Sequence, residues 1–284
     1  MADGHGALSA RQAREAAVYD ARYGELAAGE AEGSLLMDLT TPPYPNREHV
    51  EFLDDMLARM EPLDGRRVLE VGCGSGALSV YVASLGAEVT GLDVSSSVLA
   101  LAERRAEVNG LADRCRFLLA PIESFDDPDG SYDVVVGNQV LHHFELDEAL
   151  ANVRRLLAPG GIAVFCEPVL LLPEAARRLR GSPMVLRRFP SRADTPDERS
   201  IGRAEVDKIC TAFGRAEMKE YQLLTRLQNF VELSDPVFAR LERLDRVLLR
   251  YLPPARRLCR YMVFVLSGQP AWPAGARFAA EAAR

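Results

Sequence analysis

The sequence predicts an α/β protein with a doubly wound, mostly parallel sheet, N-terminal helices and a helical cap. Over residues 67–167, short β-type runs alternate with segments of helical period, which is typical of βαβ units with right-handed crossovers. The runs YDVVVG and IAVFC are continuously apolar, as expected of strands that are buried on both faces of a sheet. With 284 residues, of which 48% are hydrophobic, the chain can bury a large core.

The first 66 residues predict two helices that are joined by a proline-stiffened loop. SARQAREAAVYDARYGEL begins at Ser9, a suitable N-cap residue. NREHVEFLDDMLARM repeats apolar residues at helical spacing, and LTTPPYPN between the two is the loop.

Five strands are expected next, and a helix, a strand, a long helix and a last strand follow them. The five are RVLEV, AEVTGLD, CRFLLA, YDVVVGN and GIAVFCEP. The later elements are a helix near 203–213, a strand near 216–224, a helix near 235–252 and the strand RYMVFVLSG.

Composition argues against several classes of function. The net charge of −7 is unlike that of a general nucleic-acid binder, which needs a basic surface to displace counterions. Five scattered cysteines and four histidines show no usual metal-ligand spacing, so we expect reduced thiols and no metal. The absence of an 18-residue apolar run, and the acids near the N-terminus, predict a cytoplasmic protein.

The segment VLEVGCGSGALSV joins a strand to a helix through a glycine turn. Such a turn is a general anion cradle, because free backbone N–H groups and the helix dipole point into it. GCGSGA also satisfies the dinucleotide fingerprint, and Asp93 ends the next strand, where it could bind a ribose hydroxyl. An NAD-dependent oxidoreductase is therefore one alternative.

Glu70 in this segment favours a cationic ligand over a phosphate. Two like charges about 4 Å apart cost about 1 kcal/mol in water and about 4 kcal/mol at a protein surface. S-adenosylmethionine carries an ammonium and a sulfonium, has no phosphate, and brings a ribose for Asp93. The charge of the turn thus predicts this cofactor.

A longer series of motifs resembles a known family. VLEVGCGSG, VTGLDVS, SYDVVVGNQVLHHF and RLLAPGGIAVFCEP occur in the order and spacing of the class I S-adenosylmethionine-dependent methyltransferases, especially their small-molecule branch. The resemblance implies a Rossmann-like sheet of seven strands whose last strand is antiparallel. It also implies a division into an N-terminal helical lid (1–62), a cofactor-binding core (63–168), a C-terminal half of the sheet with acceptor-binding insertions (169–268) and a tail (269–284).

The resemblance also implies which residues hold the cofactor. The methionine part would face Glu70, Gly72, Cys73, Gly74 and Gly76. Asp93 would bind the ribose, Val94 would flank the adenine, and Asn138 would lie near the sulfonium. The family often has an aspartate after the third strand to bind the adenine amino group. This chain has Pro121 there instead, so the expected adenine contacts are Ile122 and Glu123.

Candidate catalytic residues follow the fourth and fifth strands. Methyl transfer needs an aligned acceptor and at most one base, and His142 or His143, with Glu167, is placed to supply it. Adjacent residues cannot both point into one pocket, and the alternative is that LHH is a structural feature of the family. A lid formed by Tyr19, Tyr23 and Tyr44 is expected over the cofactor, with ordinary packing of these tyrosines as the alternative.

Two arginine-rich segments, 177–203 and 240–260, interrupt the acidic sequence. The second is a helix whose other face carries apolar residues, namely Val237, Leu241, Leu244, Leu248 and Leu252. These segments suit an anionic or lipid-like acceptor or a peripheral membrane contact. The alternative is solvated arginines on a helix that packs its leucines against the core.

Together these observations predict transfer of a methyl group from S-adenosylmethionine to O, N or C of a small organic molecule, a secondary metabolite, by in-line displacement without a metal. The alternatives are an NAD-dependent oxidoreductase and a catalytically silent S-adenosylmethionine-binding module. A monomer or homodimer without a nucleic-acid partner is expected.

Overall fold

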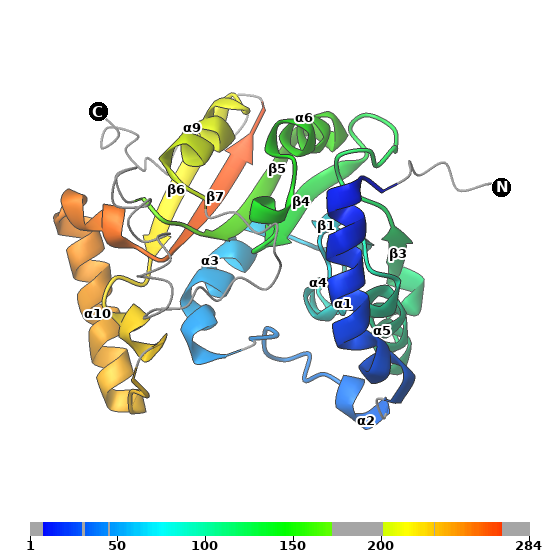
Figure 1. Ribbon diagram of the computed structural model, residues 1–284, viewed down its shortest axis with the longest axis horizontal. Helices are drawn as coiled ribbons and strands as arrows, with labels where there is room; N and C mark the ends of the chain where they lie inside the picture. The colour runs from blue at the N-terminus through cyan, green and yellow to red at the C-terminus, as the bar shows by residue number, and fades with distance from the viewer. Residues whose placement is uncertain (1–7, 30–31, 45, 172–200, 230, 269–284) are drawn as a thin grey trace.

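The computed structural model describes residues 8–29, 32–44, 46–171, 201–229 and 231–268 (Figure 1). Its strands form one seven-stranded sheet in the order β3-β2-β1-β4-β5-β7-β6. They are β1 (Arg67–Val71), β2 (Glu88–Asp93), β3 (Cys115–Leu119), β4 (Tyr132–Asn138), β5 (Leu157–Pro168), β6 (Arg215–Tyr221) and β7 (Tyr261–Ser267). The pairs among β1 to β5 are parallel, whereas β7 is antiparallel to both β5 and β6. The predicted fold class is confirmed.

The helices cover both faces of this sheet (Figure 1). They are α1 (Ala10–Gly29), α2 (Glu32–Leu35), α3 (Val50–Met60), α4 (Ala77–Ser84), α5 (Ser96–Val108), α6 (Leu146–Leu156), α9 (Arg203–Thr211) and α10 (Asp235–Tyr251). Short 3₁₀ turns are η1 (Arg47–His49), η2 (Ala112–Arg114), η3 (Leu141–His143), η4 (Thr225–Asn229) and η5 (Pro253–Leu258). In Figure 1, α1 lies beside α5 over one half of the sheet, and α10 lies beyond β6 at the opposite end.

The core is divided by the sheet into two apolar layers. Val134 and Val136 of β4 face a layer that includes α3 and α4, whereas Val135 between them faces a layer that includes α6 and α9. Both sides of the strand are therefore buried, which explains its unbroken apolar sequence. Strand β5 begins at Leu157, earlier than the sequence predicts, because Leu157 pairs with Tyr132 across a register shift.

The start of α1 agrees with the predicted N-cap. The Gln12 backbone N–H donates to Ser9 Oγ at 3.3 Å, and the Ser9 N–H donates to Gln12 Oε1 at 2.8 Å. This reciprocal pair is a capping box, which fixes where the helix begins.

Helix α10 buries a different face from the one that the sequence predicts. Its buried residues are Phe238, Asp245 and Leu249, whereas Leu244 and Leu252 of the predicted apolar face are 44% and 50% exposed. Asp245 determines this orientation. Its carboxylate accepts hydrogen bonds from the backbone N–H groups of residues 223, 224 and 225 and from the Thr225 hydroxyl, and buried donors of this kind need an acceptor.

The other arginine-rich segment, 177–203, lies outside the described residues up to position 200. Among the helices that the structure describes, none is both long and apolar enough to cross a lipid bilayer.

Candidate active site

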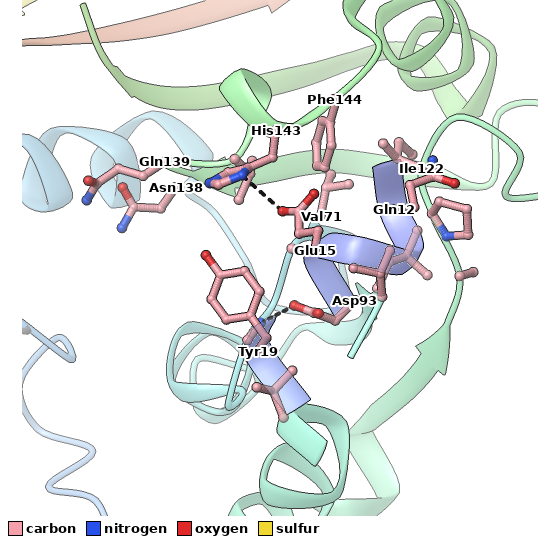
Figure 2. A pocket seen from close by; sticks show the side chains of 18 of the residues that line it. Gln12, Glu15, Tyr19, Val71, Asp93, Ile122, Asn138, Gln139, His143 and Phe144 are labelled. Carbon is pink, nitrogen blue, oxygen red and sulfur yellow. Dashed lines mark hydrogen bonds and ion pairs between the residues drawn. The ribbon is translucent and has the colours of Figure 1, made fainter. Parts of the chain in front are cut away.

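A cavity of about 210 Å³ lies at the carboxyl edge of the sheet, under α1 (Figure 2). Loops that follow four neighbouring strands form its walls. They contribute Gly72 and Gly74 after β1, Asp93 and Val94 at β2, Ile122 and Glu123 after β3, and Asn138 and Gln139 at β4. Open α/β sheets place their ligands at this edge, and seven of these eight residues are ones that the sequence predicts.

The backbone of the turn favours glycine at three positions, and at two of them there is no room for a side chain. Gly72, Gly74 and Gly76 have φ angles of +67°, +50° and +75°, which L side chains rarely adopt. A Cβ atom on Gly72 would lie 2.5 Å from Val140 Cγ1, and one on Gly76 would lie 2.7 Å from Ala102 Cβ. Gly72 and Gly74 therefore bring backbone atoms to the cavity wall, whereas Gly76 lets the turn pack closely against α5.

Asp93 connects the first two loops. Its Oδ2 accepts the Gly74 N–H at 2.9 Å, and its Oδ1 accepts the Ser95 N–H at 3.0 Å. Burial raises the pKa of Asp93 above its ordinary value, although these backbone hydrogen bonds oppose the shift. The carboxylate is thus fixed in direction at the cavity wall.

Three residues predicted to face the cofactor lie behind the wall of the cavity, since Glu70, Cys73 and Gly76 are not among the residues that line it. Glu70 is buried and accepts a hydrogen bond from the Ser79 hydroxyl of α4. Burial raises the pKa of Glu70 to about 8. Cys73 Sγ lies against Gly91, so closely that a Cβ atom added to Gly91 would be 2.9 Å from the sulfur. Burial raises the pKa of the Cys73 thiol well above its ordinary value.

The cavity is acidic without Glu70. Glu15, Asp93 and Glu123 line it, and no lysine or arginine is among its described lining residues. Two oxygens at the wall, Asn138 Oδ1 and Glu123 Oε2, are buried and have no hydrogen-bond partner in the described part of the chain. Buried acceptors of this kind call for a donor. Ammonium and amino groups supply donors, whereas a pyrophosphate brings only further acceptors and negative charge.

The two histidines of η3 face different cavities, as expected for adjacent residues. His143 lines the cavity described above, and its Nδ1 lies 3.0 Å from Glu15 Oε1 of α1 (Figure 2). His142 lines a second cavity, between η3 and α9. His142 Nδ1 lies 2.7 Å from Glu167 Oε2.

Glu167 holds the turn that carries the histidines. It is fully buried, and its Oε1 accepts the backbone N–H groups of Val140 and Leu141, both at 2.8 Å. Because Glu167 does not line the cavity beside His143, the predicted trio of His142, His143 and Glu167 is divided between the two sides of η3.

Two of the three predicted lid tyrosines lie at the cavity. Tyr19 and Tyr23 line it and stack with ring centroids 6.4 Å apart, and Tyr19 meets His143 edge-on at 6.5 Å. Tyr44 is elsewhere, donating to Asp54; burial raises its pKa.

Sequence reasoning missed Glu15, although the signal for it is present. Glu15 lies on the same face of α1 as Gln12, Tyr19 and Tyr23, at helical spacings of three and four residues. A search of the predicted helix for polar residues in register with the tyrosines would have found it.

Within the described ranges, no three His, Cys, Asp or Glu side chains are arranged to hold a metal ion.

The fold is shared with solved structures of low sequence identity. Geranyl diphosphate C-methyltransferase from Streptomyces coelicolor A3(2) aligns with a TM-score of 0.60 at 14% identity, covering 93% of this chain and 100% of that one. The [4+2]-cyclase SpnF aligns with a TM-score of 0.57 at 21% identity, covering 94% and 99%. At these identities the likeness concerns the fold alone.

Sequence relatives are more specific. A family model described as a methyltransferase domain matches residues 68–161. A ubiquinone biosynthesis O-methyltransferase from Ruegeria pomeroyi is 33% identical over 180 residues, which cover 58% of this chain and 71% of that protein. The match covers a smaller share of some other relatives. An uncharacterized protein from Synechococcus sp. is 33% identical, and the match covers 65% of this chain and 45% of that protein. A ubiquinone biosynthesis O-methyltransferase from Rhizobium leguminosarum is 30% identical, and the match covers 54% of this chain and 60% of that protein. Through these matches, and with the sheet and glycine turn described above, the chain belongs to the class I S-adenosylmethionine-dependent methyltransferases.

Proposed function

We propose that this protein transfers a methyl group from S-adenosylmethionine to an oxygen, nitrogen or carbon of a small organic molecule. The observation that supports it most is the acidic cavity with two unpartnered acceptor oxygens, Asn138 Oδ1 and Glu123 Oε2. A cationic ligand rich in donors suits this wall, whereas the pyrophosphate of NAD does not. The oxidoreductase alternative is correspondingly weakened.

The residues that would hold the cofactor follow from the walls of the cavity. Asp93 would bind the ribose hydroxyls, Asn138 would lie beside the methionyl part, and Gly72 and Gly74 allow the backbone to approach it. Val94, Ile122 and Glu123 are the candidates for contact with the adenine. When bound, S-adenosylmethionine supplies a methyl carbon that is activated by the adjoining sulfonium.

Glu70 would act from behind the glycine turn. It lies one layer further from the cavity, on Ser79, and burial raises its pKa to about 8, so it would support the start of α4 rather than contact the ligand.

His143 is the proposed general base, because it is the histidine that lines the cavity. It would accept the proton that a hydroxyl, amino or acidic carbon group releases as it is methylated, a role that histidine often takes in enzymes. His142 and Glu167 would hold η3 in place. Alignment of the acceptor supplies the rest of the rate, and the proposed mechanism uses no metal.

An oxygen acceptor is the first to test, because relatives such as the Ruegeria protein are named ubiquinone biosynthesis O-methyltransferases. A secondary metabolite remains the other proposed acceptor class.

The test is transfer of a labelled methyl group to a panel of phenols, amines and carbon acids, with and without EDTA. We expect EDTA to leave the rate unchanged. His143→Ala should lower kcat by about 100-fold or more, whereas His142→Ala should lower it much less. The reverse ranking would assign the base to His142, and binding of the cofactor without transfer to any acceptor would favour the silent binding module.

A further inference from the structure

Several polar contacts attach helix α1 to the rest of the molecule. Near its start, Arg11 donates to Glu145 Oε1 at 2.8 Å and to the His142 carbonyl at 3.3 Å. Further along, Asp20 accepts the Ser95 hydroxyl at 2.6 Å. Ala16 is the one buried apolar side chain among those described on this helix.

Between these two attachments, Glu15 faces the cavity and pairs with His143. The side chains of His143 and Glu15 are only 9% and 12% exposed, with Nδ1 and Oε1 3.0 Å apart. A charged group enclosed with its partner is screened by water much less than an exposed one. The pair is therefore a defined contact between the helix and the proposed base.

The atom that Glu15 contacts determines the form of the base. A carboxylate at Nδ1 holds the ring proton on that nitrogen, which leaves Nε2 as the proton acceptor of the neutral imidazole.

The two histidines of η3 have carboxylate partners from different parts of the fold. His142 has its own carboxylate, Glu167, on β5 in the core of the sheet. Glu15 instead comes from α1, which lies outside the sheet (Figure 1). The histidine at the cofactor cavity is thus the one whose partner depends on the docking of α1.

The other charged groups around the cavity have partners other than His143. Arg11 pairs with Glu145, and Glu167 pairs with His142. Asp93 accepts backbone N–H groups, and Glu123 accepts the Glu145 N–H at 3.0 Å. Of the described acidic groups, Glu15 is the one in an ion pair with His143.

We propose that Glu15 is a positioning residue that fixes the tautomer and orientation of His143, so that docking of α1 completes the active site. The proposal rests on the proposed role of His143 in methyl transfer. It assigns to α1 a part in the chemistry beyond that of a cover.

The experiment compares Glu15→Ala and Glu15→Gln with the wild-type full chain by ¹⁵N NMR of the histidine rings and by methyl-transfer kinetics. Glu15→Ala should move the His143 ring from the Nδ1–H form toward a mixture of tautomers. It should lower kcat by about 10- to 100-fold, with a small change in the acceptor KM. Glu15→Gln, whose amide oxygen still accepts from Nδ1, should retain the Nδ1–H signals and recover part of kcat.

Asp20→Ala tests the docking itself, because it removes an acid that attaches the same helix to Ser95 and does not contact His143; its His143 signals should move in the same direction as those of Glu15→Ala. The proposal is overturned if Glu15→Ala leaves the His143 ring signals unchanged, or if kcat stays within two-fold of wild type. The NMR measurement needs no acceptor, so failure of the proposed methyl transfer would be distinguishable from failure of the Glu15–His143 pairing.

Discussion

At the scale of single residues, the cavity shows that an acidic residue next to the glycine turn need not line the cavity. Asp93, Asn138 and Glu123 lie at the cavity wall, whereas Glu70 is behind it. Glu70 precedes the glycine turn, and alternate residues of a strand face opposite sides of the sheet. Its carboxylate therefore meets Ser79 of α4.

Burial of Glu70 predicts a pH-dependent stability. Because its pKa is raised to about 8 in the folded protein from 4.5, the folded state holds this proton more tightly than the unfolded state. The contribution is present below pH 4.5 and is lost as the pH rises through 8, by up to about 1.4 kcal/mol per pH unit. In urea titrations without cofactor, the free energy of unfolding of Glu70→Gln should therefore fall less between pH 5 and pH 8 than that of the wild type.

Glu51 is the control for this measurement, since burial raises its pKa to about 7. Its side chain is 23% exposed, so solvent screening should make the effect of Glu51→Gln smaller. Equal pH dependence in the wild type and Glu70→Gln would contradict the assignment to Glu70.

At the scale of elements, α10 shows how one buried polar residue sets the orientation of a helix. The sequence predicts the element and its length closely, but a pattern rich in leucine offers more than one apolar face. The hydrogen bonds that Asp245 accepts from the 223–225 backbone select the face with Leu249 and leave Leu244 44% exposed.

This orientation predicts unequal effects of the same substitution on one helix. Leu249→Ala removes a buried side chain and should lower the free energy of unfolding by about 2–4 kcal/mol. Leu244→Ala changes a side chain that is 44% exposed and should change the free energy of unfolding by less than about 0.5 kcal/mol. Denaturant titration measures both free energies of unfolding. A larger decrease in Leu244→Ala than in Leu249→Ala would show that α10 buries the face predicted from the sequence.

At the scale of the whole molecule, the charge of the cavity predicts which ligands stabilise the fold. S-adenosylhomocysteine keeps the ammonium, the adenine and the ribose, so at about 100 times its Kd it should raise the free energy of unfolding by about 2.7 kcal/mol. NAD at the same concentration should leave Tm unchanged, because its pyrophosphate would meet Glu15, Asp93 and Glu123.

Thermal unfolding with each ligand measures this difference, and Asp93→Asn should reduce the shift given by S-adenosylhomocysteine. Stabilisation by NAD but not by S-adenosylhomocysteine would instead support an NAD-dependent oxidoreductase.

The sequence by itself determined the mostly parallel sheet, its seven strands with the last antiparallel through the family resemblance, and many of the residues that line the cavity. These features are local, because a strand, a glycine turn and a helix follow each other in the chain. Once the strands are predicted, the residues at the end of each strand are therefore known. Only the tertiary structure brought Glu15 to His143, divided His142 and Glu167 from that cavity, and oriented α10 through Asp245. Each of these contacts joins elements whose relative rotation depends on satisfying buried polar groups from distant parts of the chain, and no periodicity within a single segment records that requirement.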